Sequence, residues 1–176
     1  PEAYRRGLLA AADASLDAKL RVAYWLEAAQ IGDESASDAQ TLYRKVVEDE
    51  AAQPAQVLAA LRKLTQLLQG EENAAERLDA LEKQAALETT PGVRRALLGE
   101  AAALATHGGE VERAIGLWEM RLQTDPNDRK ALDGLVDRLA SAERWVDLAV
   151  VLRRRAKADL PPAQRRADLV QLARVQ

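Results

Sequence analysis

The sequence predicts an all-α protein: an open, right-handed α-solenoid of antiparallel helix pairs, with about ten helices. Composition is the first reason, because Ala and Leu are abundant while the chain has no Phe, three Trp and three Tyr. Strands favour β-branched and aromatic residues, whereas Ala, Leu, Arg and Glu favour helices. The second reason is a set of helix-start signals 35 to 37 residues apart, at Asp17, Pro54, Pro91, Pro126 and Pro162. The third is the apolar stripe, at three- and four-residue spacing, that follows each start.

These start signals predict the first helix of each repeat. Proline suits the first turn of a helix, because the N–H group that it lacks would have no partner there. The five predicted first helices span residues 16–32, 53–70, 90–109, 125–143 and 161–176.

A short polar turn should end each complete first helix and lead into a second one. The turns lie at 32–35, 70–73, 107–110 and 141–143, and glycine in three of them suits the left-handed conformation that closes a helix. The second helices are predicted at 37–52, 73–87, 110–125 and 144–159. They align on four sets of residues, one face each: Ala39/Leu42/Tyr43, Leu78/Leu81/Glu82, Ala114/Leu117/Trp118 and Leu148/Val151/Leu152.

The predicted organisation is a single repeat domain over 1–176. It comprises a half repeat (1–16), four repeats (17–53, 54–90, 91–125 and 126–160) and another half repeat (161–176). Because the chain starts with Pro1, we expect a piece of a longer protein. A helix without its neighbour exposes an apolar face. We therefore expect residues 8–16 or 169–175 to fray or to mediate self-association.

A helix–turn–helix of this length, with small residues at fixed points, resembles the tetratricopeptide repeat. The match is best over 95–128, where Ala102 and Ala114 take the small-residue places, Trp118 the aromatic place and Pro126 the closing proline. Residues 129–160 match more loosely, and 18–90 keep only the rhythm. Residues 23–49 also resemble the half-tetratricopeptide repeats of RNA-processing scaffolds. The resemblance implies a solenoid that binds partners on its concave, first-helix face.

Catalytic chemistry is not indicated. The chain has no Cys, and its one histidine, His107, stands at a helix end where a cation is favourable. We expect no cofactor and no metal, since zinc sites draw on several Cys and His residues. A net charge of −3 gives no field that attracts nucleic acid. No apolar run is long enough for a membrane span, which favours a soluble, cytoplasmic protein.

Cations recur four residues after the repeat starts, at Arg21, Arg95, Lys130 and Arg166, and Arg94, Arg129 and Arg165 adjoin three of them. Cations oppose the dipole in a helix's first turns. One explanation is ion pairing with acids of the preceding helix, such as Glu88 or Asp125. The other is a basic ladder along the groove, facing an acidic peptide.

Two other groups of side chains have alternative interpretations. The tryptophans at 25, 118 and 145 are expected to pack in the core, with Trp145 the most exposed. The basic run Arg153, Arg154, Arg155 and Lys157 either stabilises the end of its helix or docks an acidic partner.

The predicted function is a non-enzymatic scaffold that binds a peptide or protein partner on the first-helix face. The predicted contact residues are Arg95, Gly99, Ala103, Lys130, Asp133, Asp137 and Arg166. Gly99 and Ala103 would leave room for a partner that is acidic toward Arg95 and Lys130 and basic toward the two aspartates. The alternatives are a structural spacer or oligomerisation arm and, third, an RNA-binding repeat module.

Overall fold

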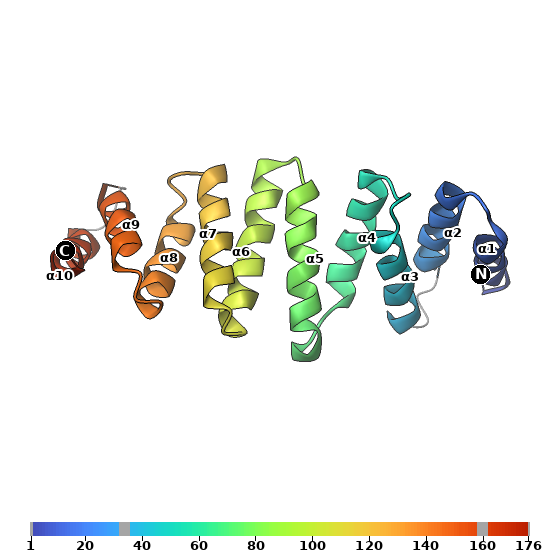
Figure 1. Ribbon diagram of the computed structural model, residues 1–176, viewed down its shortest axis with the longest axis horizontal. Helices are drawn as coiled ribbons and strands as arrows, with labels where there is room; N and C mark the ends of the chain where they lie inside the picture. Colours follow the sequence, from blue (N-terminus) through green and yellow to red (C-terminus); the bar gives the residue numbers. More distant parts are fainter. Residues whose placement is uncertain (1, 32–35, 158–161, 176) are drawn as a thin grey trace. The chain divides into compact units, whose positions relative to one another are not determined.

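A computed structural model describes residues 2–31, 36–157 and 162–175. These residues form ten α-helices and one short 3₁₀-helix, and none of them lies in a β-strand (Figure 1). The prediction of an all-α protein with about ten helices is confirmed.

The helices alternate between the predicted first and second positions of the repeats. The first helices are α2 (Ala18–Ile31), α4 (Pro54–Leu67), α6 (Pro91–His107), α8 (Arg129–Ser141) and α10 (Pro162–Val175). The second helices are α1 (Glu2–Ala14), α3 (Ala36–Glu48), α5 (Ala74–Leu87), α7 (Val111–Thr124) and α9 (Trp145–Lys157). The 3₁₀-helix η1 (Glu71–Asn73) leads into α5.

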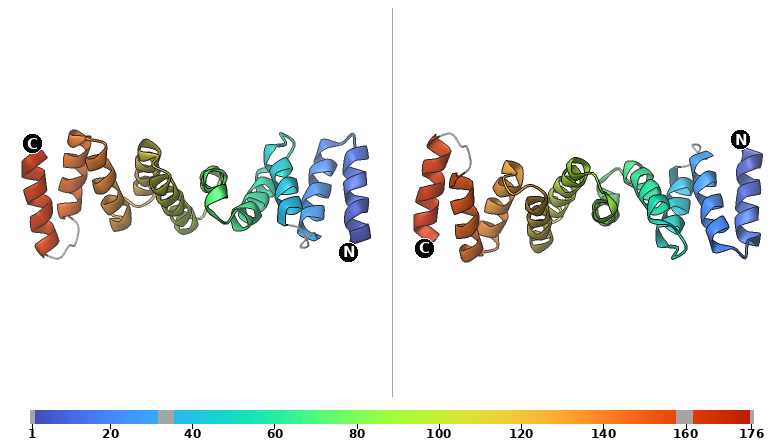
Figure 2. Two further views of the ribbon diagram at one scale, coloured as in Figure 1. Left: turned by 90° about the horizontal axis from the view of Figure 1, so that it is seen from below. Right: turned by 90° about the horizontal axis from the view of Figure 1, so that it is seen from above.

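The chain divides into two compact units, unit 1 (Pro1–Glu88) and unit 2 (Thr89–Gln176). Within unit 1 each helix from α1 to α5 packs against the next, and the same holds from α6 to α10 in unit 2. Successive helices inside each unit run in opposite directions (Figure 2). This helical-repeat-like order of neighbours is the arrangement that the sequence periodicity predicts. A single continuous repeat domain stays a prediction.

Prolines begin α4 and α6 as expected. At the start of α2, where there is no proline, the Asp17 carboxylate caps the helix by accepting the Lys19 N–H at 2.8 Å. The prediction is wrong at Pro126, because α8 begins three residues later, at Arg129. There the Asp125 carboxylate accepts the Asn127 N–H at 3.1 Å, which holds the chain in a turn. Asp128 then caps α8 by accepting an N–H from its first turn.

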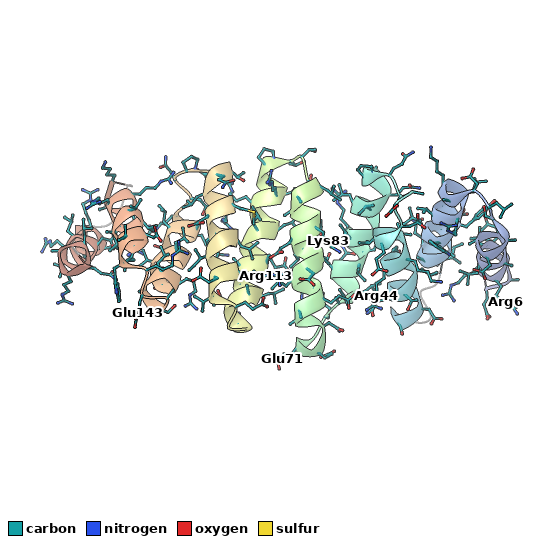
Figure 3. All side chains as sticks on the ribbon, in the orientation of Figure 1. Arg6, Arg44, Glu71, Lys83, Arg113 and Glu143 are labelled. Carbon is teal, nitrogen blue, oxygen red and sulfur yellow. The ribbon has the colours of Figure 1, made fainter. Side chains whose placement is uncertain are left out.

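Left-handed residues end several of the first helices. Gly70 and Gly109 have φ angles of 94° and 75°, as the glycine turns predict, and Glu143 has 55° at the end of α8. The N–H of Glu143 bonds to Ala140 O and that of Arg144 to Leu139 O, the pattern that Gly109 and Glu110 make after α6. Figure 3 labels Glu143 in this turn. The turn predicted at 32–35 lies outside the described residues.

The aligned apolar positions form the core. Most are buried, and Glu82 and Val151 are half-buried. Trp118 is 6% exposed and Trp145 is 46% exposed, so the prediction that Trp145 is the most exposed tryptophan is confirmed. Trp25 is half-buried between the cations of Arg21 and Lys45, each 5.4 Å from its ring centre.

The two end helices differ in what they expose. Leu169 and Val170 on α10 are both about half exposed, as expected for a helix that lacks a neighbour. On α1, Leu8 and Ala12 are buried against α2, so these two residues do not belong to an exposed face. Leu16, after α1, is fully exposed. Self-association through these ends stays a prediction.

Candidate binding surfaces

Arg95 in the first turns of α6 lies in an ion-pair network. Its Nη1 donates to Asp125 Oδ2 at 2.7 Å, and its Nε lies 3.7 Å from Asp128 Oδ2. Asp125 is one of the two acids that the ion-pairing explanation names, so Arg95 is ion-paired as that explanation expects. Both acids, however, follow α7, the next helix, whereas the explanation expected acids of the preceding helix. The same direction recurs in unit 1, where Arg21 pairs with Asp49 and Arg62 with Glu88.

Gly99 is buried and makes room for Arg121 of α7, not for a ligand. A Cβ at Gly99 would lie 2.1 Å from Arg121 Nη1. This guanidinium donates to both carboxylate oxygens of Asp128, at 2.8 and 3.2 Å, and to the Arg95 carbonyl at 3.2 Å. The prediction that Gly99 leaves space for a partner therefore fails, because an arginine of the same unit fills that space.

Asp128 is buried, and its environment favours the ionised form. Burial by itself raises the pKa of this carboxyl, but the hydrogen bonds from Arg121 and the Ala131 N–H outweigh it. Together with the charges of Arg121 and Arg95 they hold the pKa below its usual value. Asp128 is thus at once a helix cap and the ionic link between α7 and α8.

Asp133 lies in a second network of the same kind, one repeat further on. Arg155 of α9 donates to Asp133 Oδ1 at 2.9 Å and binds Asp168 of α10 through two nitrogens. Asp168 is 1% exposed and Arg155 is 9% exposed. Asp133 also lies 3.8 Å from Arg129. Its charge therefore serves the packing of α8, α9 and α10.

Four predicted contact residues remain at the surface: Ala103 on α6, Lys130 and Asp137 on α8, and Arg166 on α10. His107 Nδ1 lies 2.7 Å from the carbonyl oxygen of Ala103. The histidine therefore lies against the last turn of its own helix, as the sequence indicates. The structure gives Lys130, Asp137 and Arg166 no ion pair with any described residue.

Two of these residues belong to a surface that we call the α8–α10 basic cluster, formed by Arg129, Lys130, Arg165 and Arg166. All four are exposed. Arg129 Nη2 donates to Gln164 Oε1 at 2.7 Å, which places the first turns of α8 and α10 side by side. Four cations thus gather where two helices also present the positive ends of their dipoles.

Three acids of the neighbouring ion-pair networks already bind arginines, and one of these arginines, Arg129, belongs to the cluster. Asp128 is bound by Arg121, and Asp168 is bound by Arg155. Asp133 is shared between Arg155, at 2.9 Å, and Arg129, at 3.8 Å. The cluster therefore keeps an excess of positive charge, although the whole chain carries −3.

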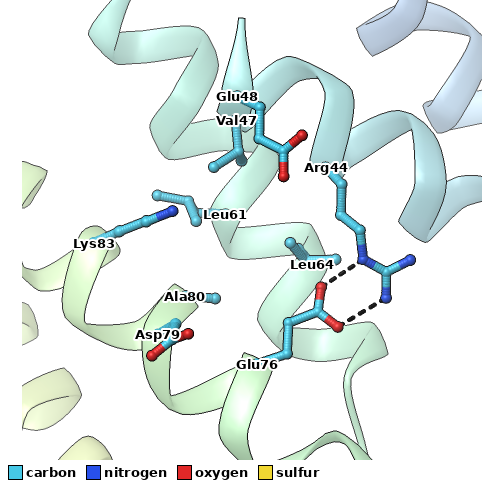
Figure 4. A pocket seen from close by; sticks show the side chains of 9 residues that line it. All are labelled: Arg44, Val47, Glu48, Leu61, Leu64, Glu76, Asp79, Ala80 and Lys83. Carbon is cyan, nitrogen blue, oxygen red and sulfur yellow. Dashed lines mark hydrogen bonds and ion pairs between the residues drawn. The ribbon is translucent and has the colours of Figure 1, made fainter.

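Unit 1 contains a pocket of about 170 Å³ between α3, α4 and α5, which we call the α3–α5 pocket (Figure 4). Its apolar lining is Val47, Leu61, Leu64 and Ala80, and its charged lining is Arg44, Glu48, Glu76, Asp79 and Lys83. Arg44 and Glu76 close one end through a bidentate ion pair, with Nε–Oε1 at 2.5 Å and Nη2–Oε2 at 2.9 Å.

The described residues do not indicate a metal site or a membrane span. They contain no group of three or more His, Asp or Glu side chains placed to hold a metal ion. None of their helices is both long and apolar enough to cross a membrane. Comparison of the chain with protein-family models, with curated proteins and with solved structures finds no match in any of the three.

Sequence reasoning missed Arg121, Arg155 and Asp168 as a structural set, and it missed the α3–α5 pocket. A signal for the arginines exists: each stands three residues after the aligned positions of Trp118 and Leu152, on an otherwise apolar face. A charge that recurs at a core position indicates a buried partner. The pocket has no such signal, because its residues come from three helices with no shared spacing.

Proposed function

We propose that this chain is a non-enzymatic protein-interaction scaffold built of tetratricopeptide-like repeats, an α-solenoid that binds an acidic segment of a partner protein through the α8–α10 basic cluster. The observation that carries the proposal is the cluster itself: four exposed cations in the first turns of α8 and α10, two helices that the Arg129–Gln164 hydrogen bond links, with Asp128 and Asp168 already engaged. A cluster of this kind repels itself unless an anionic partner covers it.

The tetratricopeptide-like assignment rests on local features of unit 2. Ala102, Ala114 and Trp118, at the small and aromatic places of the repeat, are all buried. Pro126 stands in the turn between α7 and α8. Gly134 supports the same reading, because a Cβ there would lie 2.5 Å from the Trp118 ring, so the two helices approach closely at this point.

The ion pairs alter the charge pattern that we propose for the partner segment. Arg95 and Asp133 are held in internal ion pairs, so they are poor contacts for a ligand. Lys130 and Arg166 remain as the exposed cations of the original set. A partner segment should therefore be acidic over the cluster, and apolar next to it, since Leu169 and Val170 are exposed one turn beyond Arg165 and Arg166.

A protein partner is favoured over RNA by the lack of stacking surfaces at the cluster. Single-stranded nucleic acids are usually bound by aromatic side chains as well as cations. Of the described aromatic residues, the exposed ones are Tyr4, in unit 1, and Trp145, at the start of α9. The cluster lies near the other end of α9, where Arg155 binds Asp168 and Asp133.

The test is a charge reversal with a matched control. Peptides that bind the intact chain are first selected by display. Their affinities for the parent chain and for Lys130→Glu/Arg166→Glu are then compared by fluorescence anisotropy. We expect a loss of about 1–2 kcal/mol, or roughly tenfold, and weaker binding of the parent chain as salt rises. Lys19→Glu/Lys63→Glu in unit 1 makes the same charge change on exposed residues and should leave binding unaltered.

Other outcomes distinguish the alternatives. If Arg154→Glu abolishes binding while Lys130→Glu/Arg166→Glu does not, the site is the second-helix face of unit 2. If selection yields no peptide ligand, the spacer function is supported. Filter binding of RNA across a salt series, abolished by Lys130→Glu/Arg166→Glu, would instead support the nucleic-acid alternative.

A further inference from the structure

The α3–α5 pocket in unit 1 has a different chemistry from the α8–α10 basic cluster, and the proposed function does not use it. We propose that it binds one aliphatic side chain of a partner polypeptide, with the polypeptide backbone hydrogen bonded to Glu48 and Lys83. The site would be a second recognition point of the scaffold, independent of the acidic segment proposed for unit 2.

The lining of the pocket favours a branched aliphatic group. Leu61, Leu64 and Ala80 form its floor and are at most 4% exposed, and half-buried Val47 forms a wall. None of its nine lining residues is aromatic. A volume of about 170 Å³ is far above the roughly 10–15 Å³ that one water needs, so a side chain of several carbon atoms can enter.

The shape of the pocket is held before any ligand arrives. Arg44 on α3 and Glu76 on α5 bridge the two helices with a bidentate ion pair, the strongest geometry that these groups form. This bridge sets the separation of α3 and α5 over the floor that α4 provides (Figure 4). A preformed site loses less affinity to ordering on binding.

Two further charged residues that line the pocket would choose a polypeptide. Glu48 on α3 and Lys83 on α5 are both exposed and carry opposite charges. Figure 4 draws no ion pair between them, and the charge of Glu48 also acts on Arg44, one turn earlier on α3, where it helps to raise the pKa of the guanidinium. Glu48 can accept a hydrogen bond and Lys83 can donate one, and every non-proline residue of a peptide offers one N–H and one C=O. A hydrocarbon or a fatty acid would leave at least one of these two groups unused.

The repeat alignment indicates that the pocket is particular to unit 1. Glu119 and Val146 of unit 2 take the aligned positions of Arg44 and Glu76. An acid and a valine cannot form the bridge that closes the end of the pocket. Val150 takes the position of Ala80, which makes it the natural site for a matched control.

The probe is a blocked leucine, N-acetyl-leucine-N′-methylamide, because it carries the side chain and both backbone groups and nothing else. Binding to the intact chain is followed by NMR of ¹³C-labelled Leu and Val methyl groups. We expect saturable shifts of Val47, Leu61 and Leu64 with a Kd in the low millimolar range. The blocked alanine analogue should bind about tenfold more weakly, because each buried methylene contributes to affinity.

Two variants of the pocket and one control variant in unit 2 test whether the probe binds there. Ala80→Leu fills the pocket and should weaken the probe at least tenfold, whereas Val150→Leu in unit 2 should leave it unaltered. Because a filled pocket could disturb packing, Lys83→Met on an exposed residue provides a second measurement. It should weaken the blocked leucine several-fold but leave 3-methylbutan-1-ol, which has no amide, unaffected.

Methyl shifts that persist in Ala80→Leu, or no shift at any accessible concentration, would overturn the proposal. Equal weakening of the alcohol and the blocked leucine by Lys83→Met would overturn the role of the backbone contacts. The charge reversal Lys130→Glu/Arg166→Glu should not alter these shifts, so this site and the proposed function can fail separately.

Discussion

In unit 1 the last turns of α3 and α5 pack Val46 and Ala85 into the core, where both are at most 1% exposed. The aligned positions in unit 2 carry Arg121 and Arg155. These arginines are nearly as well covered, and each binds an aspartate that is itself buried, Asp128 or Asp168. In unit 1 the arginines of the ion pairs are more exposed: Arg21 is 32%, Arg44 35% and Arg62 52% exposed, although the Glu88 carboxylate that Arg62 binds is 3% exposed.

The difference shows two ways to join one repeat to the next. Apolar contacts need no partner and do not depend on pH. A buried ion pair loses hydration, which its Coulomb energy offsets only when the geometry is good, and removing one partner leaves an uncompensated charge. Unit 2 should therefore be the unit whose stability depends on single residues and on protonation.

The largest expected effect is that of Asp128→Ala. It removes the cap of α8 and leaves Arg121 without its carboxylate, so we expect the free energy of unfolding of unit 2 to fall by about 3 kcal/mol. Asp17 in unit 1 also caps its helix, but it has no ion pair with any described residue. Asp17→Ala should therefore lower the free energy of unfolding by only about 1 kcal/mol. Native-state hydrogen exchange in α8 and α2 measures both. Equal losses would mean that the buried pair contributes nothing.

Acidification should separate the two units. The pKa of Asp128 is lowered in the folded state, so its stabilisation is complete above the unfolded value near 4 and is lost as pH falls through the folded value. Hydrogen bonds from Arg21 and the Ala51 N–H also lower the pKa of Asp49 in unit 1, but this carboxyl is less buried.

We expect exchange in α8 to accelerate more than in α2 between pH 5 and pH 3, beyond the intrinsic change of rate. Asp128→Asn keeps an acceptor for the cap and should remove most of the difference. If the mutant chain keeps the same pH dependence, Asp128 is not its source.

Replacing a helix glycine by alanine should change the free energy of unfolding less, and the sign of the change should differ between the two units. A Cβ at Gly134 would lie 2.5 Å from Cε2 of the Trp118 ring, whereas one at Gly7 of α1 meets nothing within 4 Å. Gly134→Ala should destabilise unit 2 by about 1–2 kcal/mol, because the ring must move. Gly7→Ala should stabilise unit 1 by up to about 1 kcal/mol. Urea unfolding checks both, and a stable Gly134→Ala would show that the ring has room to shift.

The smallest effect concerns the turns. Glu143 has a φ of 55°, where unit 1 uses Gly70 at 94° in the turn after α4. Glu143→Gly removes the strain of a left-handed side chain and should raise the stability of unit 2 by about 0.5–1 kcal/mol. Gly70→Ala, the converse change in unit 1, should lower stability by a similar amount. A thermal melt of each variant is sufficient, and unaltered melting of Glu143→Gly would contradict the strain.

Much of the local structure was predictable from neighbouring residues. The repeat period placed the helices, and the polar turns at 70–73, 107–110 and 141–143 lie within a few residues of their predicted positions. The prolines at the repeat starts predict Pro126 as the first helical residue of α8. Instead Asp125 accepts the N–H of Asn127 and Asp128 accepts that of Ala131, so the helix begins only at Arg129. Side chains that compete for backbone N–H groups decide such boundaries, and their choice depends on geometry that the sequence does not contain.

The candidate sites were less predictable. Lys130, Asp137, Ala103 and Arg166 lie at the surface as the helical pattern indicates. Arg95 and Asp133 are held in ion pairs, and Arg121 fills the space beside Gly99. A helical pattern gives the face on which a residue lies. It does not tell whether the long side chain of a neighbouring helix reaches that face first.

The sequence by itself determined the fold class, the number and order of the helices, and the absence of thiol chemistry, because these follow from composition and from spacing along one helix. The tertiary structure alone decided which charges are free. Arg121, Arg155 and Arg44 find their partners on other helices, at separations of 7 to 32 residues, and only the packing of α3, α4 and α5 brings the pocket together. Ion pairs and pockets depend on distances between elements, which no spacing within one element specifies.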